Sequence, residues 1–272
     1  MSTAILEPPT KAPRLLRHDF SLSKIGPTIS IIIPTLNEEG FIDQLLEDIV
    51  QQDESYEVIV ADSGSFDQTE EIVRNFAKRH PTKTIRFLKA RKKGVSIARN
   101  TGANHAKGEY ILFLDADTRI PPEFLKNTIN EMKERDLDAA GCYLLPNSER
   151  VLDKTIFYLH QHLILKPLQY TKRPGAAGAG IVVKKSVHNQ IFGFDEKFKY
   201  NEDLEYVKKI SEIRQFRMLK SAQIIYSMRR FDEEGRPRVW FKYAVSGLCY
   251  LLDLKYVKFQ YEFGKFSKNN HK

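Results

Sequence analysis

The stretch Tyr110-Ile-Leu-Phe-Leu-Asp115-Ala116-Asp117-Thr118 is an apolar run that ends in two carboxylates one residue apart. A continuous run of large apolar residues is typical of a buried strand in a parallel sheet. Because burying charge is costly, we expect Asp115 and Asp117 at the exit of that strand. Ligands of open α/β sheets collect beyond the carboxyl ends of the strands. The stretch therefore predicts a strand with a ligand site at its end.

Two carboxylates at such a place suit a hard divalent cation. Mg²⁺ or Mn²⁺ is usually held by one or two carboxylates together with the phosphates of a substrate, so the implied ligand is a nucleoside diphosphate. The alternative is an Asp-rich turn that caps the helix expected near Pro121 and Pro122, because Asp and Thr are favoured just ahead of a helix. By itself, the Asp-x-Asp pattern leaves both interpretations open.

Short β-rich runs alternate with helical patterns around this stretch. The expected strands are 30–33, 57–61, 84–88 and 109–114, and the expected helices are 39–51, 68–79, 95–105 and 122–134. This alternation is typical of βαβ units, which form a mostly parallel sheet with helices on both faces. Successive strand ends then lie on one rim, where we expect Asn37, Asp62 and Asp115.

The alternation stops after 139–144. The apolar and aromatic segment 151–168 is expected to be an insertion. The glycine-rich segment 174–180 leads into an expected strand at 181–183, and its glycines permit either a tight turn or a close backbone approach to a ligand or another strand. A helix is expected from Asn201-Glu202-Asp203 to about 213, and acidic residues at its start complement the helix dipole.

Composition describes a folded, basic chain. Its 272 residues are 42% hydrophobic, which suffices for a large core, and its net charge of +8 is dispersed without a nucleic-acid-binding module. Cys142 and Cys249 form no metal or disulfide pattern, which is typical of the reducing cytosol. No apolar run reaches the roughly 18 residues that a membrane span needs. Residues 1–27 lack the apolar region of a signal peptide and are expected to form a flexible arm.

Five motifs, taken together and in order, resemble those of the family 2 glycosyltransferases, which have the GT-A fold. They are IIIPTLNE at 31–38, VADSGS at 60–65, GVSIARNTG at 94–102, DAD at 115–117 and NED at 201–203. The resemblance covers about residues 29–232. It favours the metal interpretation of Asp115 and Asp117 over the helix cap.

The resemblance implies a nucleotide-sugar donor and places most candidate residues around it. Asp117 would contact Mg²⁺ or Mn²⁺ directly, with Asp115 nearer the ribose or a metal-bound water. Asp62 is similar to a carboxylate that accepts a hydrogen bond from a uracil N–H, which favours a UDP-sugar. Pro34 and Thr35 would line the same nucleoside pocket.

Four further charged residues complete the predicted donor site. Arg99 resembles the family's basic residue near the nucleotide, although it could instead pair with Asp62 or another acid of the rim. Glu38 ends the first motif and is assigned to the same site. Arg229 and Arg230 could approach the diphosphate after a loop closes, or could be surface arginines at a strand end.

Asp203 matches the family's general base, which removes the proton of the acceptor hydroxyl during inverting transfer. Glu202 is the alternative base, or it orients Asp203. A third possibility is that Asp203 only begins its helix. The segment Gln215-Phe-Arg-Met-Leu lacks the Gln-x-x-Arg-Trp signature of processive members, which favours single-sugar transfer.

The predicted domains are a flexible arm at 1–27, a catalytic domain at 28–235 and a C-terminal aromatic and basic helical extension at 236–272. The catalytic domain divides into a nucleotide-binding half, 28–118, and an acceptor half, 119–235. A helical stripe of Trp240, Ala244, Leu248 and Leu251 is expected to be buried against the catalytic domain. The segment 156–170 and the lysine-rich tail after Lys255 suit an anionic membrane surface.

The sequence thus predicts a cytoplasmic, inverting, non-processive glycosyltransferase, peripheral on the inner face of a membrane, whose acceptor is a lipid or a glycan. One alternative is a nucleotidyltransferase that makes nucleotide sugars, but such enzymes carry a glycine-rich loop where this chain has Pro34 to Glu38. The other is a noncatalytic nucleotide-sugar-binding protein of the same fold. Such a protein is expected to have lost Asp117 or Asp203.

Overall fold

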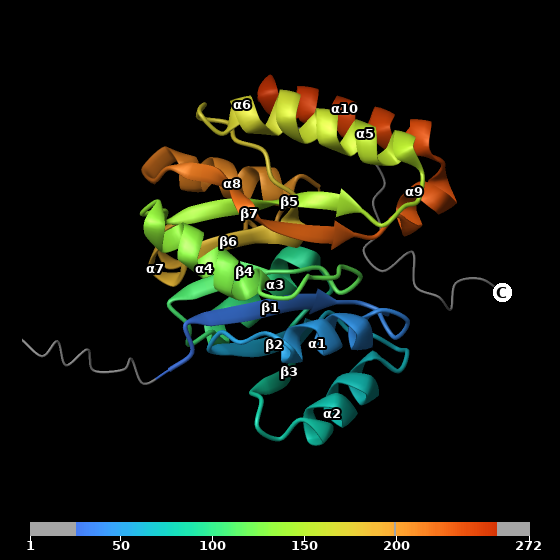
Figure 1. The fold of residues 1–272 in the computed structure, drawn as a ribbon, viewed down its shortest axis with the longest axis vertical. Coiled ribbons are helices and arrows are strands. Elements are labelled where there is room, and N and C mark those ends of the chain that lie inside the picture. Colours follow the sequence, from blue (N-terminus) through green and yellow to red (C-terminus); the bar gives the residue numbers. More distant parts are fainter. Residues whose placement is uncertain (1–25, 199, 255–272) are drawn as a thin grey trace, which may run out of the picture.

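The computed structural model describes residues 26–198 and 200–254, which form a seven-stranded sheet between layers of helices (Figure 1). The strands lie in the order β3-β2-β1-β4-β6-β5-β7, and β6 alone runs antiparallel to its neighbours. Their bounds are β1 Ile29–Thr35, β2 Tyr56–Asp62, β3 Ile85–Lys89, β4 Tyr110–Phe113, β5 Ala139–Pro146, β6 Ile181–Lys184 and β7 Phe216–Tyr226. The mostly parallel sheet confirms the fold class that the sequence predicts.

Helices cover both faces of this sheet, as predicted. They are α1 Ile42–Val50, α2 Thr69–Arg79, α3 Val95–His105, α4 Phe124–Glu134, α5 Val151–Leu159, α6 Lys166–Leu168, α7 Lys185–Gln190, α8 Glu202–Ile213, α9 Arg229–Glu234 and α10 Arg236–Leu251. A π-helical segment, η1 (His160–Leu165), joins α5 to α6, and a 3₁₀ turn, η2 (Gly178–Gly180), precedes β6.

Alternating side chains of the strands build two cores. In β1, Ile31 and Ile33 pack on one face with α1, α2 and α4, whereas Ile32 packs on the other with α3 and α8. Successive side chains of a strand point to opposite faces, so a run that is apolar at every position must be covered twice. This double burial fixes the strand ends, and hence the rim, in place.

Several elements differ from the sequence expectations. Helices α7 and α9 were not among the expected helices. The helix expected from residue 39 begins at Ile42. The eleven-residue strand β7 has no counterpart among the expected strands, because Arg217, Lys220 and Gln223 interrupt its apolar pattern. A register shift in its pairing with β5 also breaks the simple alternation.

The segment α5-η1-α6 and helix α10 lie together above the far edge of the sheet (Figure 1). A small third core of Phe157, Met228, Phe231 and Val239 holds them there. The expected buried stripe of α10 is wrong: Leu248 is 55% exposed, and the buried residues near it are Cys249 and Tyr250. None of the described helices combines the length and apolarity needed to cross a bilayer.

Candidate active site

Asp115 and Asp117 lie just beyond β4, where the sequence predicts them. The Thr118 hydroxyl donates a hydrogen bond to the Asp115 carbonyl oxygen at 2.7 Å, which closes a turn and turns both carboxylates into the rim. Helix α4 begins only at Phe124 and has Glu123 at its cap position. The helix-cap interpretation of the two aspartates is therefore wrong.

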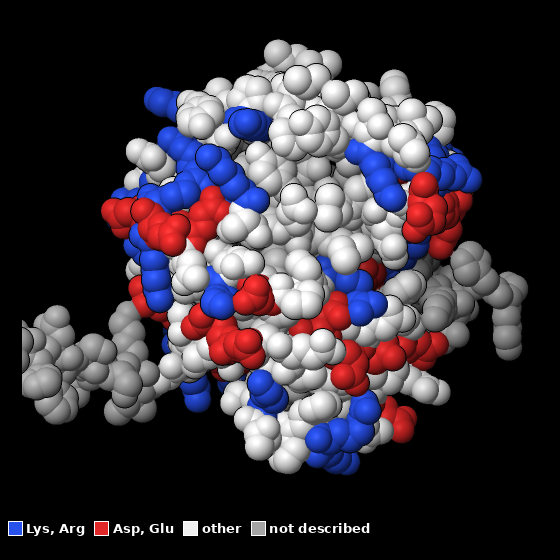
Figure 2. Space-filling view, in the orientation of Figure 1, with Lys and Arg blue, Asp and Glu red and all other residues white. Residues whose placement is uncertain are grey.

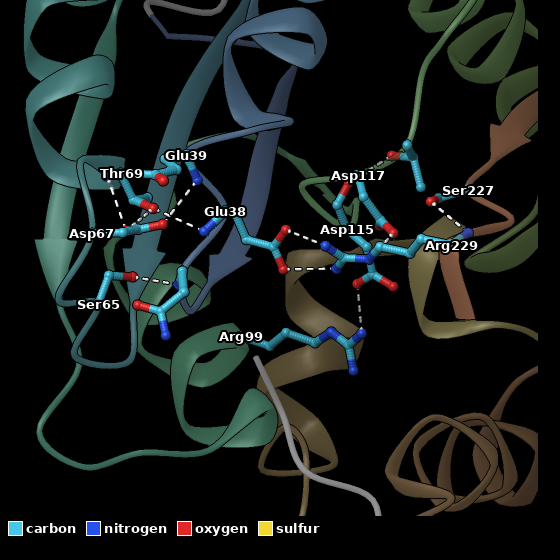
Figure 3. Close-up of polar contacts among 12 residues, drawn as sticks. Glu38, Glu39, Ser65, Asp67, Thr69, Arg99, Asp115, Asp117, Ser227 and Arg229 are labelled. Carbon is cyan, nitrogen blue, oxygen red and sulfur yellow. Dashed lines mark hydrogen bonds and ion pairs between the residues drawn. The ribbon is translucent and has the colours of Figure 1, made fainter. Parts of the chain in front are cut away.

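Arg229 joins two of the predicted acids, Glu38 and Asp117 (Figure 3). Its two terminal nitrogens donate to the two Glu38 carboxylate oxygens, each at 2.9 Å, and its Nε lies 2.9 Å from Asp117 Oδ2. Such a fork is the strong, geometrically specific form of an arginine–carboxylate pair. Arg229 therefore lies inside the site and is not a surface arginine.

Arg99 joins a second pair of acids. Its Nη2 lies 3.0 Å from Asp115 Oδ1, and its Nη1 lies 3.0 Å from Glu202 Oε1. The arginine side chain is only 3% exposed. Its partners are Asp115 and Glu202, so it pairs with acids of the rim other than Asp62, which is one of the alternatives that the sequence left open. Arg99 thus connects the end of β4 to the start of α8.

Asp203 is the second residue of α8, after Asn201 at the cap position. Its Oδ2 accepts a hydrogen bond from the Gly178 N–H at 2.9 Å, and its Oδ1 accepts one from the Leu204 N–H at 2.8 Å. A Cβ at Gly178 would lie 2.4 Å from Arg99 Nη2, so any larger residue there would have to displace the arginine. The sequence pattern did not identify this partner of Asp203, although the glycine-rich segment signalled a close backbone approach.

Five carboxylates share this cluster with two arginines that pair with four of them. Burial raises the pKa of Glu38 to about 7, against the opposing effect of Arg229, and it also raises the pKa of Asp117. Burial, and then the charge of Glu202, raises the pKa of Asp203 to about 7. The cluster thus has more carboxylates than arginines, and burial disfavours the charged forms of those that no arginine compensates, so a bound cation would stabilise them.

Thr35 and Asp62 meet at the ends of β1 and β2, beside this cluster. The Thr35 hydroxyl donates to Asp62 Oδ1 at 2.9 Å, and the N–H groups of Gly64 and Ser65 donate to Asp62 Oδ2, each at 2.9 Å. These contacts hold the loop after β2. Asp62 is thus brought to the predicted rim, with its oxygens engaged by the loop.

One cavity of about 1490 Å³ contains most of the predicted site residues. Those that line it are Pro34, Glu38, Arg99, Asp115, Asp117, Glu202, Asp203, Arg229 and Arg230, whereas Thr35 and Asp62 lie outside its lining. Its opposite wall comes from η1 and α10, which the sequence did not assign to the site. Within residues 26–198 and 200–254, no group of three or more His, Cys, Asp or Glu side chains is gathered as a self-sufficient metal site.

Comparisons with known proteins identify the family and the fold of this chain. The family described as Glycosyl transferase family 2 matches residues 30–192. A relative from Bacillus subtilis (strain 168), "Uncharacterized glycosyltransferase EpsJ", is 35% identical over 117 residues, which are 43% of this chain and 33% of the relative. The chain thus spans about a third of the length of that curated relative.

Two solved structures share the fold. The mannosyltransferase PcManGT from Pyrobaculum calidifontis, in complex with GDP-Man and Mn²⁺, is 25% identical with a TM-score of 0.62, over 75% of this chain and 57% of that one. S. aureus TarS 1–349, in complex with UDP-GlcNAc, is 24% identical with a TM-score of 0.59, over 74% and 58%. These likenesses confirm the GT-A fold that the sequence motifs predict.

Proposed function

This chain belongs to glycosyl transferase family 2, and we propose that it transfers one sugar from a nucleoside-diphosphate sugar to an acceptor hydroxyl, with inversion at the anomeric carbon. The observation that carries the proposal is the cluster in which Arg99 joins Asp115, beyond β4, to Glu202, at the start of α8. The carboxylates beyond β4 suit a cation that would accompany the departing diphosphate, and those of α8 suit the attacking hydroxyl. A reaction between two substrates needs both sets within one cavity.

Asp115 and Asp117 fit a divalent cation of the Mg²⁺ or Mn²⁺ type. The carboxylates of the cluster outnumber its arginines, and burial disfavours their charged forms, so a cation that the diphosphate also binds would relieve the imbalance. When bound, such an ion would neutralise the negative charge that develops on the leaving diphosphate.

Asp203 is assigned as the general base. In the proposed step, the acceptor oxygen forms its bond to the anomeric carbon, the bond from that carbon to the diphosphate oxygen breaks with its electron pair, and the hydroxyl proton passes to the Asp203 carboxylate. A base works best when its pKa lies near the working pH, and the pKa of Asp203 is about 7. The Gly178 and Leu204 N–H groups hold the carboxylate in one orientation.

The arginines position these groups. Arg99 fixes Glu202 and Asp115 relative to each other, and Arg229 fixes Glu38 and Asp117. Arg230 also lines the cavity and would add positive charge for the diphosphate.

We favour a UDP-sugar as the donor. PcManGT, in complex with GDP-Man, and TarS, in complex with UDP-GlcNAc, support a nucleotide sugar without choosing the base.

A thermal-shift screen of UDP-, GDP- and dTDP-sugars, each with and without Mn²⁺, tests the proposal. A ligand at 100 times its Kd stabilises the folded state by about 2.7 kcal/mol, which raises the melting temperature by several degrees. We expect one nucleotide to shift the protein in the presence of Mn²⁺, and slow release of the nucleoside diphosphate from its sugar. No shift with any of the three, with folded protein and Mn²⁺ present, would contradict the proposal.

A further inference from the structure

The wall of the cavity opposite the carboxylates consists of two helical segments that carry almost no charge. The segment α5-η1-α6 has no Asp, Glu, Lys or Arg between Lys154 and Lys166, and α10 with its following turn has none between Lys242 and Asp253. The two segments are in contact, since the rings of Phe157 and Trp240 lie 5.2 Å apart. Helices that face water normally carry charges on the exposed side, so these stretches indicate an apolar partner.

Large apolar side chains of both segments are exposed where the cavity opens. Leu163 is 68% exposed, and Leu159, Ile164, Leu248 and Leu251 are also exposed, and all five line the cavity. Figure 2 shows that the part of the molecule formed by these helices is largely uncharged, with Lys and Arg gathered at its sides. Contiguous exposed apolar surface on a folded protein marks a binding site.

Gln161, the polar side chain at the centre of η1, is engaged within the protein. Gln161 Nε2 donates to the carbonyl oxygens of Leu144 and Phe157, at 2.8 and 3.1 Å, and its Oε1 accepts from the Leu144 N–H. The ring of Trp240 packs against Phe157, Phe231 and neighbouring rings, which reduces the face that it could offer to a sugar. The wall is thus built to contact hydrocarbon rather than a polar glycan.

Helix α10 of the apolar wall is hydrogen-bonded to two segments that surround Asp203. The Tyr250 hydroxyl of α10 donates to the Pro174 carbonyl oxygen at 2.9 Å, at the start of the glycine-rich segment that supplies the Gly178 N–H to Asp203. Ser246 of α10 also donates to the Asn201 side chain, at the cap of α8. Both contacts place α10 beside the segments that carry Asp203 and its Gly178 partner.

The cavity is larger than a single small ligand needs. Ligand pockets usually have about 300 to 1,000 Å³, whereas this cavity has about 1490 Å³. We propose that the acceptor is an amphipathic lipid whose hydrocarbon chain lies between η1 and α10 and whose hydroxyl-bearing head reaches Asp203. The assignment rests on the proposed transferase function, because the hydroxyl of the lipid head must lie within reach of Asp203, the proposed base.

Trp240 provides a direct measurement, because it is the one tryptophan of the 272 residues and it lines the cavity. The probes are hexyl, heptyl, octyl and nonyl β-glucosides, titrated below their micelle concentrations against the full chain while tryptophan emission is followed. Each added CH₂ that leaves water should increase the affinity about three- to fourfold. The emission should shift to shorter wavelength as the chain fills the groove.

A matched pair of substitutions locates the binding. Leu163 and Leu152 are 68% and 66% exposed on the same helical segment, but only Leu163 lines the cavity. Leu163→Glu should weaken octyl glucoside binding by about tenfold or more, because it places a charge against the chain. Leu152→Glu should leave the affinity within about twofold. Leu248→Glu repeats the test from α10.

Nucleotide binding, followed in parallel by thermal shift with Mn²⁺, separates this inference from the proposed function. Chain-length dependence together with loss of binding in Leu163→Glu supports the lipid groove, whether or not the nucleotide binds. An affinity that is independent of chain length, or equal effects of Leu163→Glu and Leu152→Glu, overturns the groove even where the nucleotide binds. Efficient transfer to a soluble oligosaccharide, without stimulation by longer alkyl chains, also overturns it.

Discussion

The two walls of the cavity differ in both chemistry and exposure. The wall at the strand ends is charged and tightly bonded: Arg229 alone makes three contacts of 2.9 Å with Glu38 and Asp117. The wall of η1 and α10 is apolar, and side chains such as Leu163 remain open to water. In the proposed reaction, one cavity would hold two unlike substrates, because a charged donor needs preorganised charge whereas a hydrocarbon needs only apolar area.

The largest effect is expected from the charged wall. Asp117→Asn removes one of the two carboxylates proposed for the cation, so sugar transfer should fall by roughly 10³-fold or more. The readout is nucleoside diphosphate released from the donor that the thermal-shift screen identifies. Asp138→Asn is the control, because Asp138 also pairs with basic residues, Lys184 and Arg214, but lies at the opposite end of the sheet. If the two variants were equally active, Asp117 would have no role in transfer that Asp138 lacks, which would contradict the proposal.

The pH dependence of turnover should report the proposed base. Burial raises the pKa of Asp203 to about 7, and a base acts only in its deprotonated form. Below pH 7 the deprotonated fraction falls tenfold per unit, so kcat/KM should be about 100-fold lower at pH 5 than its plateau above pH 7. Initial rates over pH 5 to 9, with folding checked by circular dichroism, measure this. A flat profile would argue against a base with a raised pKa.

Gly178 tests how closely the charged wall is packed. In Gly178→Ala the new Cβ would lie 2.4 Å from Nη2 of Arg99, which is held by Asp115 and Glu202 and cannot move without breaking those pairs. Overpacking of this kind costs about 1 to 3 kcal/mol of unfolding free energy, measurable by urea titration.

Gly247 provides the control on the apolar wall. A Cβ at Gly247 of α10 meets no atom within 4 Å, so Gly247→Ala should stabilise the protein by about 0.5 to 1 kcal/mol. If Gly178→Ala proved as stable as the wild type, the close packing of Arg99 would be wrong.

The smallest effect concerns the loop beside the cavity. Thr35→Val removes a buried hydrogen bond to Asp62 and should lower the free energy of unfolding by about 1 kcal/mol. Thr155→Val, at an exposed position of α5, should change it by less than about 0.5 kcal/mol. A larger loss in the exposed variant would contradict the role of Thr35 in holding the loop.

The same contrast explains what the sequence could predict. Asp115 and Asp117 were predictable because a buried strand and its exit are local features of the chain. The pairing of Arg229 with Glu38 was not, since the two residues are 191 positions apart. The face that α10 buries was wrongly predicted, because the helix is apolar on several sides and only tertiary packing selects one of them. The arm before residue 26 and the lysine-rich tail after Lys255 lie outside the described residues.

The central claim is that the charged wall binds the donor while Asp203 acts on the acceptor. The most direct measurement is the donor Kd and the transfer rate of Asp203→Asn, determined on the same preparation. Asn keeps the shape but has one acceptor oxygen, so it loses one of the two hydrogen bonds from the Gly178 and Leu204 N–H groups, and the free energy of unfolding should fall by about 1 to 3 kcal/mol. The protein should remain folded and the donor Kd should barely change, while the rate falls by roughly 10² to 10⁴. A well-folded Asp203→Asn protein with near-wild-type turnover would contradict the account and pass the role of base to Glu202 or another residue.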